Sequence, residues 1–267
     1  MKKLVGVYEA KKKNGELYYR SSITYFGRHI SLGSYATEKL AHKAYLEASH
    51  IFSDTTLSLE YALLHSEILS YDKAVTLINF RDNHVYIKTP IYLRKNYFEY
   101  FLSRNRSLKF DIDDLFYYSS HRIQQRGGHL FVNDYGMQYN ILSRYGIKSH
   151  GVAGKDFMFA NEDSNDYRYS NIIIINSYAG VFQQNKNGKI SYLARIHING
   201  YFNLGIFDTA ELAAIAYNKA CDLARTNGID RNFPVNYIET LSASEYAKLY
   251  TELSLPRKYL AYLSNHT

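Results

Sequence analysis

The feature that most restricts the fold of this chain is an internal repeat. Residues 6–45 and 180–217 share one pattern of glycine, aromatic and small residues. Both copies start with Gly-Val-aromatic, pass through Asn-Gly, reach Leu-Gly-x-aromatic-x-Thr and end in Ala-Tyr. The copies differ by one residue before the first turn and by one residue near the third conserved block. Agreement at so many positions predicts that the two segments fold alike.

The pattern inside each copy predicts three strands. Asn14-Gly15 and Asn187-Gly188 are typical of tight hairpin turns, because both residue types tolerate positive φ. Between Tyr192 and Asn199 the side chains alternate, with Ala and Ile on one face and Arg and His on the other. A second turn at Asn199-Gly200 leads to a third strand that ends at Phe207. Each copy is therefore expected to begin with a small antiparallel sheet.

A helix is expected to follow the third strand in both copies. Leu212, Ala213, Ala216 and their neighbours recur at the spacing of one helix face, as do Leu40, Ala41 and Ala44. In the second copy, a capping box is predicted, and its members are Asp208 and Glu211. In the first copy the cap is expected to be weaker, because Ala36 occupies the matching position.

The positive charge of the chain is concentrated in the repeat. The net charge is +7, and residues 1–53 carry nine Lys or Arg against four Asp or Glu. Residues 180–225 carry five against three, whereas the remaining segments are balanced. Solvated surface charge would explain either segment alone. Its coincidence with a duplicated module favours a nucleic-acid partner.

The sheet face that the helix leaves open is the predicted binding surface. It carries hydrogen-bonding side chains and few acids on a platform narrow enough for a major groove. An ordinary solvated face is the alternative, which the basic excess and the duplication disfavour. The DNA-contacting residues predicted in the first copy are Lys11, Lys12, Lys13, Arg20, Ser22, Thr24, Arg28 and His29. Those predicted in the second copy are Gln184, Lys186, Arg195, His197, Asn199, Tyr201 and Asn203.

The repeat resembles the ethylene-response-factor (Apetala-type) DNA-binding domain, which phage and bacterial proteins also carry, often beside HNH homing endonucleases. The resemblance lies in the Gly-Val-aromatic start, the Leu-Gly-x-aromatic-x-Thr block and the Ala-Tyr of the helix. It implies a sheet that enters the major groove and recognises bases with strand side chains. The chain departs from the family because it has no tryptophan and the third strand of the second copy is short. Carried over by position, the base-contacting residues are Arg195, His197, Asn199, Asn203, Arg20, Ser22, Thr24 and Arg28.

The middle of the chain resembles the core of an HNH endonuclease. Residues 161–172 read Asn-Glu-Asp-Ser-Asn-Asp-Tyr-Arg-Tyr-Ser-Asn-Ile, close to the usual His-Ile-Asn-Gly-Asn-x-x-Asp-Asn-Arg-x-x-Asn-Leu. The matches that set the register are Asn161, Asp166, Arg168 and Asn171. Upstream, the segment 111–115 resembles the strand and turn that lead into such domains. The run of isoleucines at 172–175 is expected to be buried.

The residues of nuclease chemistry are absent from this register. An HNH nuclease needs a histidine base to activate water and a metal to stabilise the leaving phosphate. Phe159 stands at the histidine position and Tyr167 at the central asparagine position, whereas His129 and His150 lie elsewhere. We therefore expect a degenerate domain that is not an enzyme and holds neither a metal nor a cofactor.

The expected architecture is α+β, with two small three-stranded antiparallel sheet plus helix modules flanking a degenerate HNH-like α+β middle domain. The expected boundaries are 1–53 for the first module, 54–179 for a linker helix (57–69) and the middle domain, 180–226 for the second module and 227–267 for a helical tail. In the tail, Ser242 and Glu245 predict a capping box. The tail helix is expected to pack on the second module, with a dimer contact as the alternative.

Three functions remain open from the sequence. The leading hypothesis is a sequence-specific binder of double-stranded DNA, a transcriptional regulator of phage or mobile-element descent. The alternatives are a homing-type endonuclease with a rearranged site and an inhibitor that binds a nucleic-acid-handling protein. No segment reaches the length and apolarity of a membrane span, and the polar start is unlike a signal peptide, so a cytoplasmic protein without a membrane partner is expected. The single cysteine, Cys221, forms no internal disulfide and excludes a site built from several thiolates.

Overall fold

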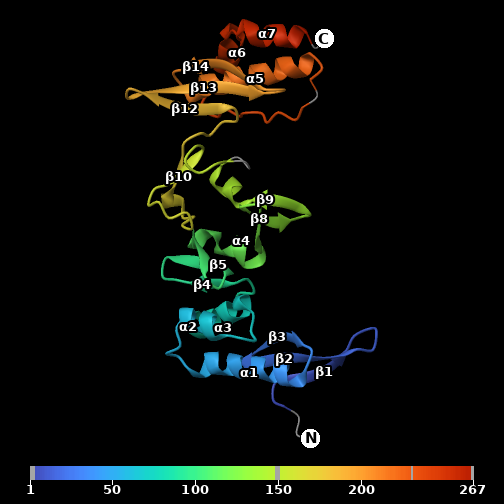
Figure 1. Cartoon of the computed structure of the whole chain (residues 1–267). Coiled ribbons are helices and arrows are strands. Elements are labelled where there is room, and N and C mark those ends of the chain that lie inside the picture. The colour runs from blue at the N-terminus through green and yellow to red at the C-terminus, as the bar shows by residue number, and fades with distance from the viewer. Residues whose placement is uncertain (1–3, 148–150, 230, 266–267) are drawn as a thin grey trace. The chain divides into compact units, whose positions relative to one another are not determined.

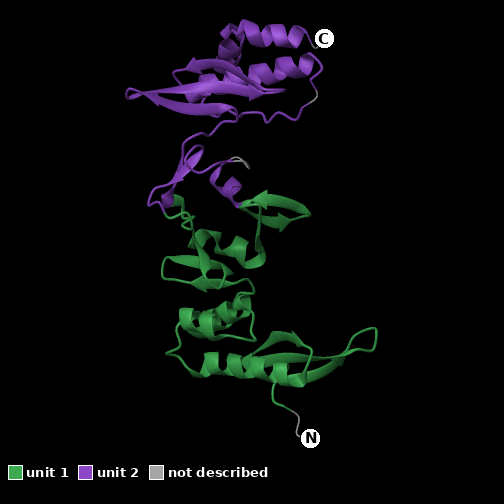
Figure 2. Ribbon diagram, viewed as in Figure 1, with its two compact units in different colours: residues 1–140, 163–169 green, residues 141–162, 170–267 purple. Residues whose placement is uncertain are grey.

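The chain folds into two compact units (Figures 1 and 2). The computed structural model describes residues 4–147, 151–229 and 231–265. Unit 1 comprises residues 1–140 and 163–169, and unit 2 comprises residues 141–162 and 170–267. Small antiparallel sheets and short helices alternate through the described residues, which confirms the expected α+β class.

Each copy of the repeat forms a three-stranded antiparallel sheet followed by one long helix. The first module consists of β1 (Val7–Lys11), β2 (Leu17–Tyr25), β3 (Arg28–Tyr35) and α1 (Glu38–Ser53). The second consists of β12 (Val181–Lys186), β13 (Lys189–His197), β14 (Tyr201–Phe207) and α5 (Ala210–Thr226). Both sheets have the strand order of the sequence, and in both the helix packs against the sheet through a row of buried alanines. The prediction of two matching modules is confirmed.

The two modules also share a backbone irregularity. The pairing of β2 with β3 shifts between Ser21 and Ser22, and the pairing of β13 with β14 shifts between Ala194 and Arg195. These positions match in the repeat. A β-bulge bends its strand and increases the local twist. The open faces of both sheets are therefore curved at the same place.

Packing explains two signature motifs of the repeat. Gly6 and Gly180 both have positive φ, and a Cβ added at either would lie about 2 Å from the ring of Tyr45 or Tyr217. The Gly-Val-aromatic start thus lies directly against the helix tyrosine in each module. The carbonyl of Gly180 also accepts a hydrogen bond from the Arg195 amide, as that of Gly6 does from the amide of the matching serine. Only glycine allows this close approach at positive φ.

One of the two predicted Asn-Gly turns has the expected geometry, and the helix caps differ from the prediction. Asn14-Gly15 lies in a longer loop, because Lys11 pairs with Leu17 and only Gly15 of the two has positive φ. Asn187 and Gly188 both have positive φ in a two-residue turn, as predicted. The predicted capping box of Asp208 is wrong. Thr209 caps α5 instead, because its hydroxyl accepts the amide of Leu212, and a threonine at position 37 caps α1 in the same way. Both copies therefore have equivalent caps.

In unit 1 the core of the first module continues into the next two helices. α2 (Leu59–His65) and α3 (Tyr71–Asn83) pack with α1 in one hydrophobic cluster. The helix predicted over residues 57–69 is shorter, because Ser58 caps it and the chain leaves the helix after His65. Arg81 is buried and donates to the carbonyls of Ile51, Asp54 and Leu57. This arginine fixes the connection between α1 and α2.

Two further small sheets and a short helix follow in unit 1, and aromatic side chains pack between the first of these sheets and the helix. β4 (Ile91–Leu93), β5 (Tyr97–Ser103) and β6 (Arg106–Asp111) form a sheet, and 3₁₀ turn η1 (Ile112–Asp114) leads into α4 (Leu115–Ser120). Tyr118 of α4 is fully buried against Phe98 and Phe110. A further sheet follows, made of β7 (Ile123–Arg126), β8 (His129–Asp134) and β9 (Met137–Asn140).

Unit 2 begins with short elements that precede the second module. They are the 3₁₀ helix η2 (Ile141–Tyr145), β10 (Phe157–Phe159), η3 (Tyr169–Asn171) and β11 (Ile172–Ile174). β10 and β11 form a two-stranded hairpin. The expectation that the isoleucine run is buried is wrong, because Ile173 and Ile174 are 45% and 41% exposed on this narrow hairpin.

The C-terminal helices pack on the second module. α6 (Ala243–Glu252) and α7 (Arg257–Ser264) follow α5, and Figure 1 shows the sheet on one side of α5 and these helices on the other. The predicted capping box of Ser242 and Glu245 is present. Tyr259 of α7 is fully buried and donates its hydroxyl hydrogen to the carbonyl of Ala220. The preferred prediction, packing on the module, is confirmed.

Candidate nucleic-acid interface

The open face of the second module alternates as the sequence predicted. On β13 and just after it, Ala194, Ile196 and Ile198 are buried beneath α5, whereas His197 and Asn199 are exposed. The helix-facing side chains fill the core, so the intervening ones are left to solvent. A row of polar groups therefore lies along the middle strand of this sheet.

Arg195 occupies the centre of this face between two aromatic rings. Its guanidinium lies 4.6 Å from the ring centre of Phe182 on β12 and 4.4 Å from that of Tyr201 on β14. Stacking on two rings is a favourable setting for a planar cation. Its Nε is buried and has no hydrogen-bond partner among the described residues. The aromatic rings, rather than polar contacts, hold this arginine in place.

The other predicted residues of the second face differ in whether neighbouring side chains hold them. His197 and Tyr201 have ring centres 4.7 Å apart, and Asn203 is exposed opposite Arg195. Asn199 donates to the Tyr262 hydroxyl at 3.3 Å and accepts from Arg231 at 3.4 Å. The side chain of Asn199 is thus engaged by the C-terminal tail.

The hairpin end of the second module contributes the remaining two predicted residues. Lys186 is exposed beside the Asn187-Gly188 turn. Gln184 is half-buried, and its Oε1 is buried without a hydrogen-bond partner among the described residues. Lys186 is therefore accessible to a ligand, whereas Gln184 presents at most part of its amide.

The first module presents a face of similar polarity. Arg20 donates to the Tyr18 hydroxyl through Nε at 3.1 Å and Nη2 at 2.6 Å. Thr24 and His29 are exposed and lie 3.5 Å apart across β2 and β3. These three side chains form the polar centre of the exposed surface.

Two predicted residues of the first module have settings that the sequence did not indicate. Arg28 is exposed but stacks on Tyr86, with its guanidinium 4.2 Å from the ring centre. Ser22 alternates with Arg20 and Thr24 along β2, but the prediction that it contacts DNA is wrong, because Ser22 is only 8% exposed and its hydroxyl is covered. Arg195 holds the matching position in the second module, and its longer side chain emerges where the serine hydroxyl stays covered.

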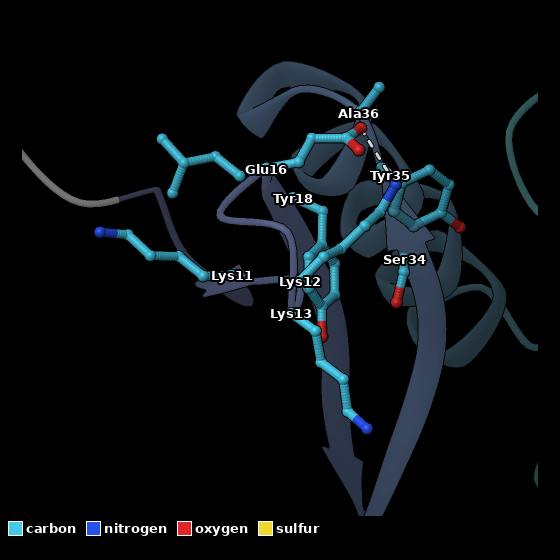
Figure 3. Close-up of a pocket in the computed structure, with 9 residues that line it drawn as sticks. Lys11, Lys12, Lys13, Glu16, Tyr18, Ser34, Tyr35 and Ala36 are labelled. Atoms are coloured by element: carbon cyan, nitrogen blue, oxygen red, sulfur yellow. Dashed lines mark ion pairs between the residues drawn. The ribbon is translucent and has the colours of Figure 1, made fainter.

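The three successive lysines of the first module border a cavity of about 580 Å³ (Figure 3). Lys12 makes an ion pair with Glu16 at 3.0 Å. Figure 3 shows Lys11 and Lys13 extending away from this pair. Tyr18 and Ser34 line the same cavity and add hydroxyl groups. An anion at this site would meet two lysines that no carboxylate neutralises in the described contacts.

In the middle of the chain, the positions that match the HNH pattern are engaged in structural contacts. Phe159, at the histidine position, ends β10, and Asn171 is buried and accepts the Asn161 amide at 2.8 Å. Tyr167 is buried against Phe110. The matched residues thus shape the loop between β10 and β11.

The charged groups of residues 163–169, which belong to unit 1, pair with each other or with a lysine of β6 in the same unit. Asp166 is fully buried and binds the Arg168 guanidinium at 2.6 Å. The amide of Asn165 and the ammonium of Lys109, 3.0 Å away, lower the pKa of Asp163. Within the described ranges, no three His, Cys, Asp or Glu side chains gather closely enough to hold a metal ion. His150 lies outside the described residues.

Some interface residues were missed from the sequence. Phe182 and Tyr86 hold the two arginines, and Tyr262 and Arg231 contact Asn199. Phe182 could have been predicted from the sequence, because it lies in the Gly-Val-aromatic block that both copies share. The others come from segments outside the repeat, where no periodicity points to the sheet face.

Comparisons with known proteins leave the family of the chain open. No protein-family model matches it, and neither the curated proteins nor the solved structures include a match. Over the residues that the structure describes, no helix is long and apolar enough to cross a membrane.

Proposed function

We propose that this protein binds double-stranded DNA sequence-specifically and without catalysis, through the open sheet faces of its two modules. The observation that supports this most is the repetition of one module, bulge included, with hydrogen-bonding and basic side chains outward in both copies. Each face is a curved three-stranded sheet backed by a helix. Such a platform suits a major groove, where base edges present distinct donors and acceptors.

We expect some side chains of the two faces to contact base edges and others to contact the phosphate backbone. His197 and Asn203 of the second module, and Arg20, Thr24 and His29 of the first, are short or anchored groups that can reach base edges. The Lys11, Lys12 and Lys13 run and Lys186 lie at the hairpin ends of the sheets and suit the phosphate backbone, which carries no base information.

The two modules are expected to recognise different sequences. At matching positions of the middle strands, one face offers Arg195 and His197 where the other offers Ser22 and Thr24. A single chain should therefore occupy a two-part site that is not a palindrome. Any palindrome would have to come from a second copy of the chain.

We assign the middle of the chain a scaffold role. Phe159 can neither accept a proton nor bind a metal, and it stands where the HNH resemblance requires the general base. The resemblance of both modules to Apetala-type domains of phage proteins favours a regulator of transcription of phage or mobile-element descent.

Selection of bound duplexes from a random pool by the full-length protein tests the proposal. A defined two-part sequence is the expected result. Replacing His197 and Asn203 with alanine should relax one part, and replacing Arg20 and Thr24 should relax the other. Enrichment of no sequence, with binding that depends only on charge, would contradict sequence-specific recognition.

A further inference from the structure

A cavity of about 390 Å³ lies beside the open face of the second module. One wall is the sheet, with Phe182, Arg195, His197 and Tyr201. The other wall is the segment 231–234, which follows α5. The chain is held there by Asn236, which exchanges hydrogen bonds with Ala179 ahead of β12 and with a buried asparagine of α5. The tail therefore completes a pocket that the repeat alone would lack.

Two cationic groups line the cavity, the guanidiniums of Arg195 and Arg231. His197 adds an imidazole, and no Asp or Glu occurs among the described residues that line it. Arg231 lies at the rim, where its Nη2 is 3.4 Å from the Asn199 Oδ1. Two guanidiniums around one small space, neither paired with a carboxylate among the described residues, favour an anion.

Arg195 is oriented for such a ligand before it binds. The rings of Phe182 and Tyr201 hold the plane of its guanidinium, and no hydrogen bond or ion pair joins it to another described residue. A guanidinium presents paired N–H donors along its edge, and these match two oxygens of a phosphate. Prior stacking reduces the side-chain entropy that binding would otherwise cost.

We propose that this cavity, here named the Arg195–Arg231 clamp, binds one phosphate group of a nucleic-acid backbone through its two guanidiniums. The source of the phosphate rests on the proposed function. Arg195 then positions the DNA instead of recognising a base. The clamp belongs to the second module alone, because Ser22 stands at the matching position of the first.

The first experiment measures duplex binding of the full-length protein across a range of salt concentrations. Arg231→Ala, with Arg231→Gln as a more conservative variant, should weaken binding about tenfold, as loss of a charged hydrogen bond does. The slope of log affinity against log salt should fall by about 0.9, and the preferred sequence should not change. Arg257→Ala, an exposed arginine of α7 away from the cavity, is the charge-matched control.

A neutral methylphosphonate, placed at each backbone position in turn, locates the partner of the clamp. At one position it should weaken the wild-type protein but cause no further loss in Arg231→Ala. The clamp is refuted if Arg231→Ala behaves like Arg257→Ala, or if it changes the preferred bases.

The second experiment uses inorganic phosphate without DNA. At constant ionic strength, phosphate in place of chloride should raise the unfolding temperature of the wild type and of Arg257→Ala more than that of an Arg195→Ala, Arg231→Ala double variant. If the wild type binds no duplex but shows this difference, the proposed function fails and the clamp remains as a site for another phosphorylated ligand. If Arg231→Ala weakens duplex binding while phosphate stabilises all three proteins equally, the phosphate that the clamp binds belongs to the DNA backbone. Equal stabilisation of all three proteins, without a duplex effect, overturns the clamp.

Discussion

Gly180→Ala tests whether the close packing of Gly180 against the Tyr217 ring stabilises the second module. A Cβ at this position would lie 2.0 Å from the Tyr217 ring and 2.8 Å from the Arg195 carbonyl oxygen. Tyr217 is buried, and the carbonyl belongs to the central strand, so neither can retreat freely. Crowding in a packed core costs about 1–3 kcal/mol. Positive φ, +71° here, adds about 1–2 kcal/mol for a residue with a side chain.

Gly188→Ala is the matched control, because its φ is +81° and nothing lies within 4 Å of the added Cβ. Both variants carry the same backbone penalty. The difference between their free energies of unfolding therefore gives the cost of crowding alone, about 1–3 kcal/mol. In the first module, Gly6→Ala should likewise cost more than Gly188→Ala, because the three nearest atoms to its added Cβ all belong to the Tyr45 ring.

The assay is native-state hydrogen exchange of the β13 amides, since a chain of two units need not unfold in one step. The amides of Ala194 and Ile196 should lose most protection in Gly180→Ala. In a Tyr217→Leu background the extra cost of Gly180→Ala should shrink. Equal losses for Gly180→Ala and Gly188→Ala would refute the reasoning.

Three further results are expected. Replacing Lys11, Lys12 and Lys13 together with alanine should flatten the salt dependence of DNA binding with little change in sequence preference, and a changed preference would mean that these lysines recognise bases. Full-length protein should not cleave plasmid DNA with magnesium, manganese or zinc, whereas specific nicking that a mutation in the middle of the chain abolishes would overturn the assignment of Phe159. Burial raises the pKa of the Cys221 thiol to about 12, so a thiol reagent at pH 8 should label the folded protein slowly and the denatured protein fully, and rapid labelling of both would contradict this burial.

The repeat made most of the module fold predictable. Turn chemistry at Asn187-Gly188 and the alternation along β13 depend on neighbours in the sequence, so both could be predicted from it. The N-caps could not be chosen in the same way, because Asp208 and Thr209 are both good cap residues and only the backbone decides between them.

The candidate site was harder to predict because its side chains are positioned by distant segments. Ser22 and Arg195 hold one position of the repeat, yet one is covered and the other emerges between Phe182 and Tyr201. The partners of Asn199, Tyr262 of α7 and Arg231, both come from segments far along the chain. Alternation predicts which face a side chain takes, but it does not predict what covers that face.

Footprinting of the selected duplex tests the central claim most directly. Full-length protein should protect two separate segments. His197→Ala with Asn203→Ala should erase one of them, Arg20→Ala with Thr24→Ala should erase the other, and Arg257→Ala should erase neither. Two segments lost independently would support DNA binding by both sheet faces. One continuous footprint that the first pair of changes abolishes and the second leaves intact would contradict it and leave the first module as scaffold.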